Sequence, residues 1–137
     1  MIGIALAHGV MVATFANATM KVSGAQFNPV ITIGLLITQK MTVLKAILYI
    51  IIQCLAGLVA GLLLLVFVDR NVIAQGTPTY NPETISLWQV ILLEMITTFF
   101  LLYVIWGLAV DPRGPKPVAI YIGLAVASSW VFLQEVP

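Results

Sequence analysis

Four long apolar runs, each able to cross a lipid bilayer, are the feature that most constrains this chain. They cover residues 1–20, 46–68, 86–110 and 118–133. A transmembrane helix needs about 20 mostly apolar residues to cross a hydrocarbon core of roughly 30 Å. Helices satisfy their own backbone hydrogen bonds in lipid, and the runs lack the two-residue alternation of a membrane barrel. The sequence therefore predicts an all-α membrane protein with a single transmembrane domain over residues 1–137.

Composition excludes several other classes of protein. Apolar residues make up 61% of the chain and charged residues only 8%, with a mean hydropathy of +1.11. The chain has six basic and five acidic residues, and the basic residues form no run. Nucleic acid is therefore not an expected partner. The single cysteine, Cys54, has no cysteine or histidine cluster near it, and we expect no metal and no cofactor.

Catalysis is not expected either. Glu94 is the one acidic residue deep inside a predicted span. The sequence offers it no second carboxylate, no Ser/His/Asp set and no HExxH pattern. We therefore predict no catalytic residue and a protein that is not an enzyme.

A shorter apolar segment, residues 30–37, lies between the first two spans. At 1.5 Å per residue a helix of about nine residues reaches roughly 13 Å, about half of a membrane. Asn28 is a favoured N-cap, and Pro29 suits the first helical position. The pattern predicts a re-entrant loop and half-helix over about residues 21–38, entering and leaving on one side.

The distribution of basic residues supports this topology. With a half-helix at this point, five of the six basic residues lie on one side of the membrane and Arg70 lies alone on the other. The positive-inside rule then predicts that residues 21–45 and 111–117 are cytoplasmic. The five are Lys21, Lys40, Lys45, Arg113 and Lys116.

A helix that begins near the membrane midplane needs polar groups or water beside its first turn, because irregular backbone at that depth is buried in protein or lines a water-filled cavity. If the Asn28 side-chain oxygen caps the helix, its NH₂ group remains as a donor toward the cavity. The positive end of the helix dipole lies at the same point. Such a point accepts a water oxygen and repels cations. The alternative is that Asn28-Pro29 only starts a helix.

The segment Ser23–Thr32, SGAQFNPVIT, resembles the first signature loop of the aquaporin (major intrinsic protein) family, which is normally SGAHxNPAVT. Residues 49–57, 93–94 and 111–113 resemble the third helix, the start of the fourth helix and a cytoplasmic loop of that family. Two departures stand out: Gln26 replaces the usual His, and Val30 replaces the usual Ala.

The family is built from inverted repeats of three helices, and this chain carries a trace of one. Residues 9–14, GVMVAT, match residues 123–128, GLAVAS, with three identities in six. By resemblance the chain runs from about helix two to helix five, an aquaporin-like bundle with one re-entrant half-helix and an incomplete inverted repeat. We expect a truncated or partial form that does not conduct alone.

The resemblance implies a transmembrane channel for passive flux of water or a small neutral solute of the glycerol type. The alternative is a non-conducting membrane scaffold or assembly partner. The implied partners are the lipid bilayer, the solute, and further copies of the chain in a homotetramer. The expected pore-lining residues are Asn28, Pro29, Val30, His8 and Trp130, and the expected supporting residues are Glu94, Gln53 and Gly24.

Overall fold

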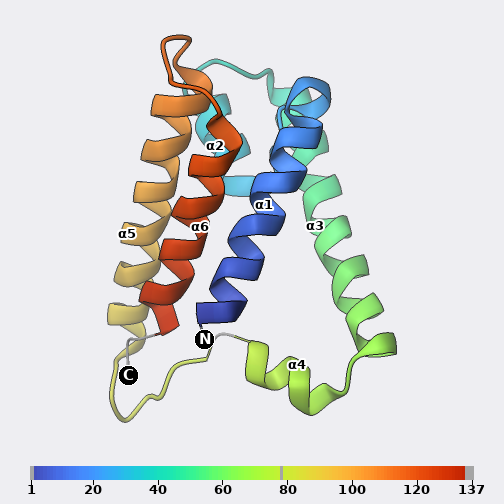
Figure 1. The fold of residues 1–137 in the computed structure, drawn as a ribbon, viewed down its shortest axis with the longest axis vertical. Helices are drawn as coiled ribbons and strands as arrows, with labels where there is room; N and C mark the ends of the chain where they lie inside the picture. The colour runs from blue at the N-terminus through green and yellow to red at the C-terminus, as the bar shows by residue number, and fades with distance from the viewer. Residues whose placement is uncertain (1, 78, 135–137) are drawn as a thin grey trace. The chain divides into compact units, whose positions relative to one another are not determined.

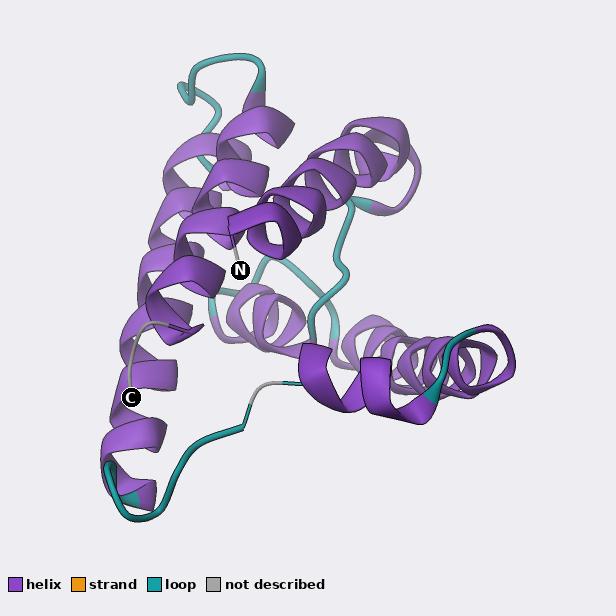
Figure 2. Ribbon diagram, turned by 60° about the horizontal axis from the view of Figure 1, so that its bottom comes forward, coloured by secondary structure: helices purple, strands orange, loops and turns teal. Residues whose placement is uncertain are grey.

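The computed structural model describes residues 2–77 and 79–134, and every regular element in that part of the chain is a helix (Figures 1 and 2). The predicted all-α fold is confirmed. The helices are α1 (Ile2–Ser23), α2 (Pro29–Ile37), α3 (Val43–Phe67), α4 (Arg70–Gly76), α5 (Leu87–Ile105) and α6 (Val118–Gln134). A five-residue π-helix, η1 (Trp106–Val110), continues α5.

Three of these elements are long and apolar enough to cross a membrane: α1, α3, and α5 together with η1. The helix α6 is apolar but has 17 residues, which corresponds to roughly 25 Å. The helix α2 has nine residues and is therefore about half the length of a span, as its sequence predicts.

The chain forms two compact units, and each is described by itself. The first contains residues 1–25 and 80–137, with α1, α5, η1 and α6. The second contains residues 26–79, with α2, α3 and α4. The prediction of a single transmembrane domain stays a prediction.

In the first unit α1 and α6 run antiparallel and cross at two glycines (Figure 1). A Cβ atom on Gly9 would lie 2.5 Å from the carbonyl oxygen of Gly123 and 2.7 Å from Cβ of Ala127. A Cβ atom on Gly123 would likewise meet the carbonyl oxygen of Gly9 and lie 2.6 Å from Cβ of Ala13. The two segments that match each other in sequence therefore pack against each other, at a distance that only small residues allow.

The helix α5 has well-defined ends. Ser86 and Gln89 form a capping box at its start, in which the Gln89 side chain accepts from the Ser86 N–H at 2.9 Å. At the far end, the Asp111 N–H donates to the Trp106 carbonyl at 2.9 Å and closes the π-helix. Arg113 then donates from Nε and Nη2 to the two Asp111 carboxylate oxygens, at 3.0 and 2.8 Å. These hydrogen bonds raise the pKa of the Arg113 guanidinium above its usual value.

Candidate pore-lining site

The amino terminus of α2 has the capped geometry that the sequence predicts. Asn28 has extended backbone angles (φ −129°, ψ 127°), and its Oδ1 accepts from the Val30 N–H at 2.9 Å. Pro29 occupies the first helical turn, where its missing N–H costs no hydrogen bond. Within the described part of the chain, the Asn28 NH₂ group has no hydrogen-bond partner. The cap is thus made by the oxygen alone, and two N–H donors remain unused.

Gln53 of α3 holds the loop before α2 and the body of α2 together. Its Nε2 donates to the Gln26 carbonyl at 2.6 Å and to Thr32 Oγ1 at 3.0 Å. The Thr32 hydroxyl can in turn donate to Gln26 Oε1 at 3.2 Å. Thr32 is completely buried, so these bonds satisfy polar groups that would otherwise be costly inside an apolar bundle. The strongly polar residue in the second predicted span, Gln53, therefore ties α2 and the loop before it to α3.

Two consecutive residues with left-handed backbone follow α1 on the way to α2. Gly24 has φ 77° and its N–H donates to the Met20 carbonyl at 3.1 Å, which ends α1 in a glycine cap. Ala25 follows with φ 52°, a conformation that disfavours a side chain with a Cβ atom. The positive φ of the cap explains why a glycine stands at position 24.

His8 and Trp130, predicted from separate parts of the sequence, lie next to each other in the first unit. Their ring centroids are 5.3 Å apart, with an angle of 40° between the planes. His8 is exposed on the surface of the chain, and Trp130 is half-buried. The indole therefore covers part of the imidazole ring and leaves the rest open.

Glu94 is exposed on α5 rather than buried inside the unit. No hydrogen bond or ion pair involves its carboxyl group within residues 2–77 and 79–134; its backbone carbonyl accepts from Thr97 Oγ1 at 3.1 Å. An ionisable group at this depth of a membrane span normally has a polar partner. Glu94 therefore marks a face of α5 that needs polar contacts.

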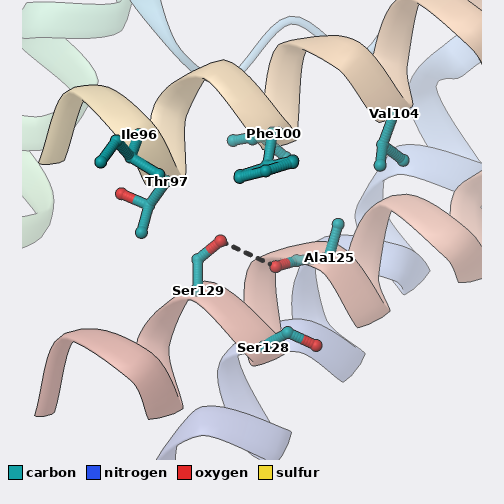
Figure 3. A pocket seen from close by; sticks show the side chains of 8 residues that line it. Ile96, Thr97, Phe100, Val104, Ala125, Ser128 and Ser129 are labelled. Carbon is teal, nitrogen blue, oxygen red and sulfur yellow. Dashed lines mark hydrogen bonds between the residues drawn. The ribbon is translucent and has the colours of Figure 1, made fainter. Parts of the chain in front are cut away.

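A groove of about 430 Å³ lies between α5 and α6, one turn away from Glu94 (Figure 3). The hydroxyls along it bond to backbone of their own helices: Ser129 to the Ala125 carbonyl at 2.9 Å, and Thr97 to the Leu93 carbonyl at 3.1 Å. The groove offers packing space rather than reactive groups. Its lining residues are Ile96, Thr97, Phe100, Leu101, Val104, Ala125, Ser128 and Ser129.

Sequence reasoning missed the roles of two residues in the second unit. By sequence Gln26 is only a departure from the family's usual His, whereas in the structure its carbonyl and its side chain both bond to the Gln53–Thr32 pair. Thr32 is the one hydroxyl within the apolar helix Pro29–Ile37. A lone hydroxyl in such a helix signals a buried partner, and that signal points to Gln53.

Comparison with known proteins agrees with this geometry. The model of the major intrinsic protein family matches residues 1–136. Aquaporin TIP4-4 of Zea mays is 32% identical over 136 residues, which cover 94% of this chain and 53% of the relative. Aquaporin AqpM of Methanothermobacter marburgensis is 36% identical over 129 residues, 92% of this chain and 52% of the relative.

Aquaporin C of Dictyostelium discoideum is 34% identical over 139 residues, 96% of this chain and 49% of the relative. The chain thus spans about half the length of the curated relatives it matches. The apolar helices and these matches make it an integral, multi-pass membrane protein. The match over nearly the whole chain confirms the resemblance of the signature loop, and the chain belongs to the major intrinsic protein family.

Proposed function

We propose that this chain forms one half of a transmembrane channel for the passive flux of water or a small neutral solute of the glycerol type. The observation that carries the proposal is Asn28. Its side-chain oxygen caps a helix of half-membrane length, and its NH₂ donors are unused. The names of the relatives, which are aquaporins, support the same function.

The chemistry at Asn28 follows from this geometry. The NH₂ group can donate to the oxygen of a passing water or hydroxyl group, and Pro29 adds no competing donor. The amino end of α2 carries a partial positive charge, which disfavours cations. Donors without a nearby acceptor orient a water molecule with its oxygen toward Asn28. A water molecule held in this way does not pass a proton along a row of water molecules in the channel. Val30, 38% exposed, places two methyl groups beside this point.

We propose that His8 and Trp130 form part of a narrow constriction in the same channel. The indole fills space beside the imidazole, and the open side of His8 supplies a polar contact for the solute. A large rigid ring next to a hydrogen-bonding ring favours small solutes over branched ones by sterics.

We propose that Gln53 and Gly24 position the half-helix and its entry turn, and that Glu94 accepts hydrogen bonds from a polar segment on the exposed face of α5. The predicted sidedness also remains a proposal: residues 21–45 and 111–117 are cytoplasmic. The antiparallel packing of α1 and α6 supports it, because Lys21 and Lys116 then belong to the same end of the first unit. A homotetramer is the expected assembly.

A chimera tests conduction directly. Residues 1–137 would replace the aligned region of aquaporin AqpM of Methanothermobacter marburgensis, which this chain matches over 129 residues. We expect proteoliposomes with the chimera to shrink under osmotic shock well above the lipid background, with a low activation energy. Stopped-flow light scattering measures the rate.

The matched control is the same chimera with Asn28→Leu, which removes both the cap and the donors. Loss of the flux in that variant supports the proposal. A chimera that folds, inserts and shows no flux above the lipid background would favour the non-conducting scaffold instead.

A further inference from the structure

The turn between α2 and α3, residues 38–42, together with the first turn of α3, forms a basic end of the second unit that the channel function does not use. Lys40 and Lys45 are both exposed there. Neither lysine has an ion pair within the described part of the chain. The nearest acid along the chain in this unit is Asp69, beyond the far end of α3. Two uncompensated positive charges therefore lie at one end of the unit.

The backbone of this turn is fixed. The N–H groups of Thr38, Gln39 and Lys40 donate to carbonyls of α2 at 2.8 to 3.0 Å, and Gln39 adopts φ 57° in a left-handed helix cap. The Thr38 hydroxyl also bonds to the Gly34 carbonyl at 2.8 Å. Because the turn is ordered before any ligand arrives, Lys40 loses little backbone freedom on binding.

Exposed apolar side chains lie close to the two lysines along the chain. Ile37, Val43 and Leu44 are 75%, 62% and 69% exposed, which suits the boundary between acyl chains and headgroups. The Lys45 ammonium lies 5.7 Å from the centre of the Tyr49 ring, one turn deeper on α3. An exposed lysine whose ammonium lies over a tyrosine ring is suited to the headgroup layer, where both polar and aromatic groups are found.

The two ends of α3 differ in charge. The helix has 25 residues and is roughly 37 Å long, so its ends reach opposite membrane surfaces. One end carries Lys40 and Lys45, whereas the other carries Arg70 directly after Asp69 and has no net charge from this pair. Only the first end attracts an anion.

We propose that this basic turn binds the phosphate of an anionic phospholipid, with Lys40 and Lys45 on the phosphate and the exposed Ile37, Val43 and Leu44 against the acyl chains. The partner is a lipid rather than a free anion, because the lysines are set among apolar side chains that a soluble phosphate would leave in water. The inference needs only a membrane protein and does not depend on conduction.

The test uses the 137-residue chain purified in mild detergent. It is titrated with phosphatidylglycerol and with phosphatidylcholine of the same acyl chains, and bound lipid is measured by native mass spectrometry. Each lysine near a membrane surface contributes about a fivefold preference for an anionic lipid. The preference for phosphatidylglycerol should therefore fall about fivefold in Lys40→Gln and about 25-fold in Lys40→Gln/Lys45→Gln.

Arg70→Gln is the matched control, because it removes one positive charge from the other end of α3 and should leave the preference unchanged. Circular dichroism verifies that each variant keeps its helix content. A double variant with an unchanged preference, or an equal loss in Arg70→Gln, would overturn the proposal. So would displacement of phosphatidylglycerol by millimolar inorganic phosphate, because that result assigns the turn to a soluble anion.

Discussion

An Asn28→Asp variant of the AqpM chimera is expected to pass water at least about tenfold more slowly and to unfold at nearly the same temperature. Asp caps helices as well as Asn does, so the bond from the Val30 N–H to the side-chain oxygen is retained. The variant replaces the two N–H donors with a negative charge. The negative charge attracts cations and protons and offers no donor to the oxygen of a passing solute, which slows the flux of a neutral solute.

Stopped-flow light scattering and thermal unfolding would be measured on the same preparations. Asn81→Asp is the matched control, because the Asn81 side chain accepts from the Glu83 N–H at 3.0 Å in the same i to i+2 pattern but lies before α5. Flux and stability that fall together in Asn28→Asp would assign Asn28 a structural role only. An equal loss of flux in Asn81→Asp would also count against a role in the pore.

Gly9→Leu is expected to have the largest effect on stability. A Cβ atom at Gly9 already lies 2.5 Å from the Gly123 carbonyl oxygen, so a leucine forces α1 and α6 apart. The obstacle is backbone and the Ala127 Cβ, neither of which can rotate away. Overpacking of this kind lowers the free energy of unfolding by about 1–3 kcal/mol. Because the variant also loses the close crossing of α1 and α6, we expect a loss near the top of that range.

Unfolding of the 137-residue chain in SDS, followed by circular dichroism, measures this loss. Gly57→Leu is the control, since a Cβ atom at Gly57 meets nothing within 4 Å. We expect Gly57→Leu to change the free energy of unfolding by less than about 0.5 kcal/mol. Equal destabilisation by the two variants would show that α1 and α6 do not depend on the glycine crossing.

The sequence could predict the helices because long apolar runs, caps and turn residues are local signals. The apolar run 46–68 nearly coincides with α3, and the Asn28-Pro29 pair marks the residue at which α2 begins. The π-helix at Trp106–Val110 could not be predicted, because an extra residue per turn depends on how the following loop folds back. The carbonyls of Gly107 and Leu108 pack against Gly114 of that loop.

The site was predictable only in part. The cap at Asn28 is local and follows from residue types, whereas the bonds from Gln53 to Gln26 and Thr32 join residues 21 to 27 positions apart. Which hydroxyls and amides meet depends on the rotation of α2 against α3, and periodicity alone does not fix that rotation. The resemblance to the aquaporin family places His8 and Trp130 together among the expected pore-lining residues, and their rings lie 5.3 Å apart in the structure.

We expect α2 to be a half-helix that brings Asn28 into the membrane, with the chain leaving on the side where it entered. Single-cysteine variants at Lys21, Lys40 and Arg70, made in a Cys54→Ser background, test it with a maleimide that does not cross membranes. Sealed vesicles of known orientation are labelled from each side. We predict that positions 21 and 40 react from the same, cytoplasmic, side and that position 70 reacts from the opposite side. Labelling of positions 21 and 40 from opposite sides would show that α2 crosses the membrane completely and is not a half-helix.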